Sequence, residues 1–208
     1  MNNKCLVVVG PTGVGKSTIA LDVCLRIKGE IINADSRQVY KEMAIGTDKP
    51  TEYAMNRVPH HMYSCTSVSE PYHIYQYNNI VRSTIREVCS RATIPVVVGG
   101  SGQYVWSLVE NWDIPGREAD PLVRSELEAR LREDSSGLAE LAEELRAVDP
   151  NTWRAVDVKN PRRVVRALEK IYCDHKSKSK SGVNMGLAPL SSVEYVVVGL
   201  TMDRRQLY

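Results

Sequence analysis

The sequence predicts an α/β fold, in which a parallel sheet flanked by helices is interrupted by a helical insertion. Three observations carry this prediction. Short apolar runs of strand length alternate with helical patterns in residues 1–112, and the first run leads directly into a glycine-rich loop. Residues 113–190 hold helical patterns, and a last apolar run in residues 191–208 predicts that the chain returns to the sheet.

The first buried strand is predicted at Cys5–Val9, and the loop GPTGVGKST follows it. This loop matches G-x-x-x-x-G-K-[ST], a pattern in which backbone N–H groups, a helix start and a lysine surround phosphate oxygens. The hydroxyl of its last residue can ligate Mg²⁺. We therefore expect a P-loop NTPase-like core whose phosphate site comprises Gly10, Pro11, Thr12, Gly13, Val14, Gly15, Lys16 and Ser17, with Ser17 as the Mg²⁺ ligand.

The rest of the core is predicted as alternating helices and strands. The helix after the loop should end near residue 28 with Gly29 as its C-cap, and a strand over 30–34 should follow. A polar loop region then leads to further elements. These are a helix over about 72–92, a strand over 94–98 that ends in Gly-Gly-Ser-Gly, and a helix over 103–110.

The insertion is predicted to contain three helices. One begins at Asp120-Pro121 and ends near Glu133, the leucines of residues 138–145 mark a second, and Asn160-Pro161 opens a third. The segment KSKSKSG, residues 176–182, is predicted as a basic loop. A strand over 195–200 follows, and a helix that starts at Asp203 runs for about one turn before the last residue, which leads us to expect a truncated protein.

Composition restricts the class of protein. The chain of 208 residues is 43% hydrophobic and 25% charged, which indicates a globular protein. Its five cysteines form no C-x-x-C pair, and no apolar run approaches the length of a membrane span, so we expect a cytoplasmic protein with no membrane partner. We further expect a monomer. The net charge of +2 is uneven, because residues 150–208 carry 11 Lys/Arg against 5 Asp/Glu. This basic end is either a polyanion-binding surface or an ordinary solvated face.

Asp35 is the candidate reactive group. Ligands of doubly wound sheets bind at the carboxyl ends of the strands, and Asp35 in NADSRQVY follows the strand predicted over 30–34. An alternative is that Asp35 only forms an Asx turn or caps a short helix. An ATPase would be expected to have an acidic residue at the end of a further strand, whereas the strand over 94–98 ends in glycines.

The motifs together resemble one family. GPTGVGKST, IINADSRQVY, IGTDKP, VPHH, IPVVVGGSGQY, ADPLVR and KNPRRVVRALE occur in this order, and the chain is similar to the tRNA dimethylallyltransferases, or tRNA isopentenyltransferases. The resemblance implies a prenyltransferase that moves a dimethylallyl group from dimethylallyl diphosphate to N6 of the adenosine 3′ of the anticodon, with release of diphosphate. Its implied partners are tRNA, through the anticodon stem-loop, and dimethylallyl diphosphate, and its implied cofactor is Mg²⁺.

The resemblance also implies roles for individual residues. Asp35 would be the general base, while Thr12 and Lys16 would be catalytic through contacts with the diphosphate. Family members continue well past the position of residue 208 and gain a further diphosphate-binding arginine there, so we expect this chain to bind tRNA weakly and to turn over slowly or not at all. The residues that would contact tRNA are Asp35, Ser36, Arg37, Gln38, Ser101, Arg124, Arg162, Arg163 and Arg166.

Two other motifs of the resemblance, VPHH and GTDKP, contain histidines and a lysine whose roles can also be predicted. His60 and His61 of VPHH lack a third ligand at metal spacing, so we expect hydrogen-bonded histidines and no metal site. Lys49 of GTDKP is a weaker candidate for the diphosphate site.

Other functions stay open at the level of the sequence. One is an adenylate isopentenyltransferase that acts on free AMP, ADP or ATP, and another is a small P-loop kinase in which the insertion forms a lid. A third is a protein that only binds diphosphate.

Overall fold

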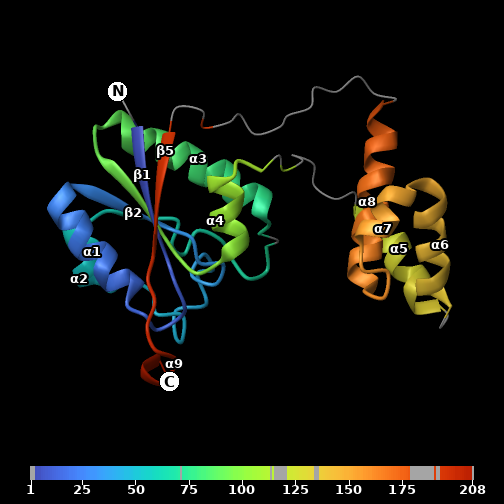
Figure 1. Ribbon diagram of the computed structural model, residues 1–208, viewed down its shortest axis with the longest axis horizontal. Helices are drawn as coiled ribbons and strands as arrows, with labels where there is room; N and C mark the ends of the chain where they lie inside the picture. Colours follow the sequence, from blue (N-terminus) through green and yellow to red (C-terminus); the bar gives the residue numbers. More distant parts are fainter. Residues whose placement is uncertain are drawn as a thin grey trace. The chain divides into compact units, whose positions relative to one another are not determined.

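The computed structural model describes residues 3–70, 72–112, 114, 121–133, 136–178, 190 and 193–207. It divides into two compact units (Figure 1). The core unit comprises Met1–Pro115 and Gly186–Tyr208, and the helical unit comprises Gly116–Met185. Residues 179–182 of the expected basic loop lie outside the described residues.

The core unit is built on a five-stranded parallel sheet. Its strands are β1 (Asn3–Val9), β2 (Gly29–Asn33), β3 (His60–His61), β4 (Ile94–Val98) and β5 (Val193–Gly199), in the order β3-β2-β4-β1-β5. Figure 1 shows β1 beside β5 although the two are far apart in sequence. Because all strands run the same way, the residues that follow β1, β2 and β4 meet at one edge, which is where such sheets bind ligands. The expected α/β fold is confirmed.

Helices cover both faces of this sheet. The covering helices are α1 (Lys16–Ile27), α3 (Ile74–Ser90) and α4 (Gly102–Val109), and the core unit also contains the short helices α2 (Glu52–Arg57) and α9 (Arg204–Leu207). One apolar cluster joins Ile32 and Val97 to α3 and α4, and a second joins Ile31 and Val96 to α1. Successive strand residues thus enter opposite clusters, which explains why these strands are apolar without alternation.

Gly29 was wrongly expected to cap α1. Lys28 is the C-cap instead, with a left-handed φ of 54°, and Gly29 is the first residue of β2. Packing explains the glycine, because a Cβ atom there would lie 3.1 Å from the carbonyl oxygen of Ile94 and 3.2 Å from Sγ of Cys24. The structure thus shows that Gly29 is needed for close packing and not for a turn.

The region expected to be a polar loop between β2 and α3 contains two further short elements. The α2 helix begins after Thr51, whose side chain accepts a hydrogen bond from the N–H of Ala54. The two residues of β3 pair with Ile31 and Ile32 and extend the sheet at its edge. Both elements are too short to give a clear hydrophobic period.

The helical unit contains α5 (Pro121–Glu133), α6 (Gly137–Val148), α7 (Pro150–Ala155) and α8 (Pro161–Lys178). Its own apolar core consists of Val123, Leu127, Leu141, Leu145, Val164, Val165 and Leu168. The α7 helix was not expected; its N-cap is Asp149, whose carboxylate accepts hydrogen bonds from the N–H groups of Asn151 and Thr152. The basic loop was expected from residue 176, but α8 continues to Lys178.

Among the helices in the part of the chain that the structure describes, none is both long and apolar enough to span a bilayer.

Candidate functional site

The P-loop follows β1 and presents backbone groups to an anion. Gly15 is the N-cap of α1 with φ 84°, and no side chain caps this helix start. Its first N–H groups therefore stay available to a ligand, and the positive end of the helix favours phosphate there. Thr12 and Ser17, the two predicted hydroxyl contacts, are both exposed at this edge.

Lys16 folds back over the loop. Its Nζ donates a hydrogen bond to the carbonyl oxygen of Pro11 at 2.8 Å. Burial lowers the pKa of Lys16 below its ordinary value, and the negative charge of Asp35 acts in the opposite direction. The lysine of the P-loop and the carboxylate after β2 thus lie close enough to influence each other.

The end of β4 brings the three strand ends together. A Cβ atom at Gly99 would lie 2.2 Å from the carbonyl carbon and oxygen of Ala34, so only glycine fits beside β2. At Gly100 a Cβ atom would lie 3.7 Å from the carbonyl oxygen of Gly10 and 4.0 Å from Nζ of Lys16. The Gly-Gly pair therefore packs between the end of β2 and the P-loop.

Ser101 connects the same two strand ends by hydrogen bonds. Its Oγ accepts from the N–H of Ser36 at 2.8 Å, and its own N–H donates to the carbonyl oxygen of Ala34 at 3.2 Å. Ser101 and Ser36, both predicted tRNA contacts, thus lie next to each other.

Asp35 forms an Asx turn and keeps one oxygen available. Its Oδ1 accepts a hydrogen bond from the N–H of Arg37 at 2.8 Å. Within the described residues no hydrogen bond engages Oδ2. Burial raises the pKa of Tyr104 to about 12, with smaller contributions from the charges of Tyr40, Cys65 and Asp35. The turn at Asp35 therefore fixes the orientation of the carboxylate and occupies only one of its two oxygens.

The residues after Asp35 are held by a hydrogen-bonded loop. Gln38 donates from Nε2 to the carbonyl oxygens of Thr47 at 2.6 Å and Asp48 at 3.0 Å, whereas Arg37 is exposed. Lys49 donates to the carbonyl oxygen of Tyr40 and, at 2.8 Å, to Oγ of Ser64. Lys49 therefore contributes to holding this loop, and its expected place near the diphosphate stays a prediction.

His60 and His61 are engaged in hydrogen bonds, as expected. His60 Nδ1 lies 2.7 Å from the carbonyl oxygen of Val58, and His61 Nε2 lies 2.6 Å from Oε2 of Glu30. Burial alone would raise the pKa of Glu30, but hydrogen bonds from Arg91, His61 and Thr93 together lower it. In the described part of the chain no three metal-ligating side chains of the His, Cys, Asp or Glu type come together.

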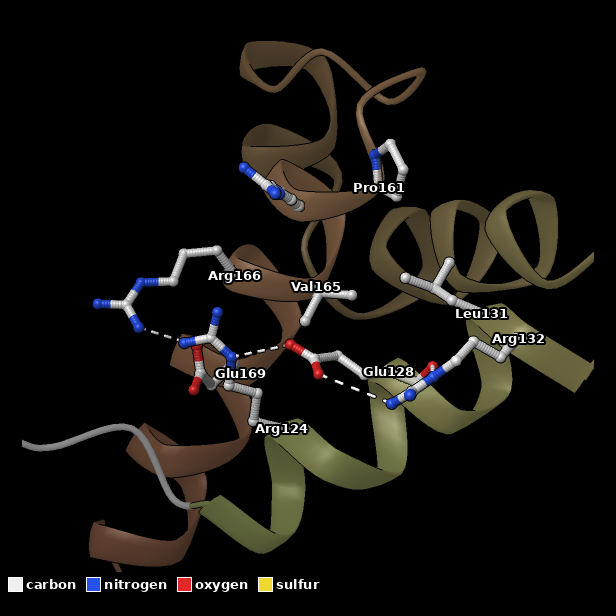
Figure 2. A pocket seen from close by; sticks show the side chains of 9 residues that line it. Arg124, Glu128, Leu131, Arg132, Pro161, Val165, Arg166 and Glu169 are labelled. Carbon is white, nitrogen blue, oxygen red and sulfur yellow. Dashed lines mark hydrogen bonds and ion pairs between the residues drawn. The ribbon is translucent and has the colours of Figure 1, made fainter. Parts of the chain in front are cut away.

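The helical unit has a pocket of about 530 Å³ between α5 and α8. Figure 2 shows Glu128 between Arg124 and Arg132, and Arg166 next to Glu169. The lining residues are Arg124, Glu128, Leu131, Arg132, Pro161, Arg162, Val165, Arg166 and Glu169. Three predicted tRNA contacts, Arg124, Arg162 and Arg166, therefore share one pocket, whereas Arg163 is exposed and is not part of its lining.

Sequence reasoning missed the carboxylates of this pocket. Glu128 pairs with Arg124 at 3.0 Å and with Arg132 at 3.9 Å, and Glu169 pairs with Arg166 at 2.9 Å. The signal was present, because 124, 128 and 132 are spaced by four residues and 166 and 169 by three, which puts each set on one helix face.

Comparisons with known proteins point to one family. A family model described as IPP transferase matches residues 38–208, and one described as isopentenyl transferase matches residues 3–70. The tRNA dimethylallyltransferase of Bacillus pumilus is 37% identical over 203 residues, which are 98% of this chain and 63% of that protein. That of Corynebacterium efficiens is 43% identical over 166 residues, covering 80% of this chain and 54% of the relative.

Two solved structures are similar. The full-length tRNA isopentenylpyrophosphate transferase of Bacillus halodurans has a TM-score of 0.60 at 32% identity and covers 100% of this chain and 62% of that one. A eukaryotic dimethylallyltransferase acting on tRNA has a TM-score of 0.70 at 26% identity, with 95% and 48% covered. The chain thus spans roughly 63% of the length of a curated relative that it matches. Because the IPP transferase model matches most of its residues, the chain belongs to the IPP transferase family.

Proposed function

We propose that the chain transfers a dimethylallyl group from dimethylallyl diphosphate to N6 of the adenosine 3′ of the anticodon in tRNA. The observation that carries this proposal is the position of Asp35, whose carboxylate is held at the end of β2 by Arg37, close to the P-loop lysine, with Oδ2 available. A base and a diphosphate site side by side are what an alkylation with a diphosphate leaving group requires.

The P-loop binds the diphosphate of the prenyl donor. Its N–H groups and the start of α1 supply donors, and the Lys16 ammonium exchanges the carbonyl of Pro11 for a phosphate oxygen. Thr12 contacts the diphosphate near the bond that breaks. These contacts strengthen as negative charge develops on the leaving group, so they lower the barrier to breaking the C–O bond.

Asp35 acts on the nucleophile. The lone pair of adenine N6 is delocalised into the ring, so the amine attacks the allylic carbon poorly unless its proton is removed. As the N–C bond forms, Asp35 accepts the N6 proton, the C–O bond breaks, and its electron pair leaves with diphosphate. The contact from Arg37 to Oδ1 orients the carboxylate so that Oδ2 faces the substrate.

The residues present also fit a Mg²⁺ ion. Mg²⁺ is commonly held by one or two protein oxygens together with substrate phosphates and waters. Ser17 at the start of α1 offers one such oxygen, and its hydroxyl is exposed where the diphosphate is expected. When bound, Mg²⁺ would neutralise part of the charge of the leaving group.

The tRNA contacts divide between the two units. In the core unit the contacts are Asp35, Ser36, Arg37, Gln38 and Ser101, which receive the target nucleotide after it has left the stacked loop. In the helical unit Arg124, Arg162, Arg163 and Arg166 bind backbone phosphates.

One experiment tests the reaction. The protein is incubated with Mg²⁺, prenyl-labelled dimethylallyl diphosphate and either an anticodon stem-loop with an unmodified target adenosine or free AMP. We expect label in the RNA and a rate about 10²- to 10⁴-fold lower for Asp35→Ala. Label in AMP instead would select the free-nucleotide enzyme, and phosphoryl transfer from ATP that survives Asp35→Ala would select a kinase.

Two control variants separate the roles of Asp35. Asp35→Asn keeps an oxygen that can accept from Arg37 but cannot take the proton, so it should be as impaired as Asp35→Ala. Asp22→Ala removes an exposed carboxylate of α1 and should retain the full rate. An active Asp35→Asn protein would mean that the turn matters and the base does not.

A further inference from the structure

The two glutamates of the helical-unit pocket have very different surroundings. The side chain of Glu128 is 44% exposed and bridges two arginines of its own helix. The side chain of Glu169 is 2% exposed and contacts Arg166, whose side chain is 66% exposed. One carboxylate therefore lies at the surface, and the other reaches an exposed guanidinium from inside the helical unit.

Only one of the two carboxylate oxygens of Glu169 has a hydrogen-bond partner among the described residues. Oε2 accepts from Nη1 of Arg166 at 2.9 Å, whereas Oε1 is buried and accepts no hydrogen bond from the described residues. Its neighbours on α8, Val165 and Leu168, belong to the apolar core, where a leucine would pack at lower cost. A buried, half-paired charge is unfavourable for folding, so its presence at a pocket points to a function.

The contact with Glu169 leaves most of the Arg166 guanidinium for a ligand. A guanidinium has five N–H donors, and Glu169 engages the Nη1 end. The remaining donors can bind an oxyanion in the bidentate geometry that favours phosphate. Because an exposed arginine loses side-chain freedom when it binds, a carboxylate that already restrains it reduces that loss.

We propose that Glu169 is a positioning residue, which holds Arg166 at the α5–α8 pocket so that the arginine binds a backbone phosphate of RNA. This inference rests on the proposed function, since it takes the ligand of the pocket to be tRNA. Glu128 has the opposite effect in the same pocket, because it neutralises Arg124 and Arg132 at the surface and competes with phosphate for them.

The test compares two variants that change the net charge equally. Glu169→Gln and Glu128→Gln each remove one negative charge, so long-range attraction to RNA rises by the same amount in both. We expect Glu169→Gln to bind the anticodon stem-loop about tenfold more weakly. Glu128→Gln should bind it as tightly as the parent protein or more tightly. Equal or tighter binding by Glu169→Gln would overturn the inference.

A mutant cycle shows whether Glu169 acts through Arg166. In an Arg166→Gln background, Glu169→Gln should cause no further loss of affinity, since the residue that it positions is gone. A loss of the same size in both backgrounds would mean that Glu169 only supports the fold. Melting temperatures of all variants identify those that fail to fold.

A second measurement separates this inference from the proposed function. Inorganic phosphate is titrated into the protein, and the Nε–Hε NMR signal of Arg166 is followed. We expect the signal to shift in the parent and in Glu128→Gln, and to shift much less in Glu169→Gln; equal shifts would overturn the role of Glu169. A parent protein that binds phosphate in this way but no stem-loop would overturn the proposed function and the assignment of RNA as ligand.

Discussion

The candidate sites of the two units are built from different chemical groups. In the core unit the site consists mainly of backbone, with N–H groups of the P-loop and glycines at the end of β4 that let strands approach. In the helical unit it consists of arginine and glutamate side chains on α5 and α8. The geometry of a backbone site is fixed when the sheet folds. The geometry of a side-chain site depends on ion pairs, and an arginine can exchange its glutamate for another partner. Substitutions should therefore be tolerated very differently in the two units.

The largest expected effect tests the close packing of the core unit. Gly99→Ala places a Cβ atom 2.2 Å from the backbone of Ala34, where neither strand can move without breaking the sheet. We expect a loss of about 3 kcal/mol or more in the free energy of unfolding, measured by urea denaturation. Gly102→Ala is the matched control, because its nearest neighbour would be 3.9 Å away, and it should be neutral or slightly stabilising. A Gly99→Ala protein as stable as the parent would show that the close backbone packing of the core unit tolerates substitution after all.

The next effect concerns the buried ion cluster of the core unit. Glu30→Gln removes the charge that Arg91, His61 and Thr93 satisfy, and should cost about 2 kcal/mol of unfolding free energy at pH 7. Since folding lowers the pKa of Glu30 below 4.5, its stabilisation is present above that pH and is lost as the pH falls through the folded-state pKa. The variant should therefore lose less stability on acidification than the parent. Parallel acid profiles would refute the role given to this carboxylate.

A smaller effect is expected at Ser101, which links two strand ends. Ser101→Ala leaves the N–H of Ser36 without its acceptor and should cost about 1 kcal/mol of unfolding free energy. Ser101→Thr keeps the hydroxyl and should retain most of that stability. If alanine and threonine behave alike in thermal melts, this hydrogen bond contributes little to the carboxyl edge of the sheet.

The smallest effect is expected in the helical unit. The guanidinium of Arg146 lies 5.2 Å from the ring centre of Trp153 and is well exposed, so Arg146→Ala should cost about 0.5 kcal/mol. Arg154→Ala, which removes an exposed charge of α7, provides the control and should have no measurable effect. A loss at Arg146 as large as that at Glu30 would show that the side-chain contacts of the helical unit are less replaceable than we infer.

Local patterns in the sequence predicted the strands and the P-loop of the core unit better than the short helices of either unit. The apolar runs of β1, β2 and β4 are readable because both faces of the sheet are buried, and the P-loop is readable because its glycines occur at fixed spacing. The α2 and α7 helices were missed because six residues give no periodic signal, and their starts depend on single caps at Thr51 and Asp149. Gly29 was misjudged because a glycine that permits close packing looks the same in sequence as one that ends a helix.

The candidate sites show a similar limit. Asp35 could be identified from its position after a strand, since topology alone brings strand ends together. The pairing of Glu169 with Arg166 could have been suspected from their spacing, but its burial depends on how α8 packs against α5 and α6. Long-range packing of this kind leaves no local signal in one sequence.

The hydrogen bond from Lys16 to the carbonyl oxygen of Pro11 has a consequence for ligand selectivity. A carbonyl dipole of the loop already satisfies the Lys16 ammonium, so a ligand gains from this lysine only the difference between an ionic partner and a neutral one. That difference grows with the charge of the ligand, and it vanishes for a neutral hydroxyl or amide. The loop should therefore discriminate by ionisation state, holding a fully ionised diphosphate and releasing uncharged prenyl alcohols that share the same hydrocarbon tail.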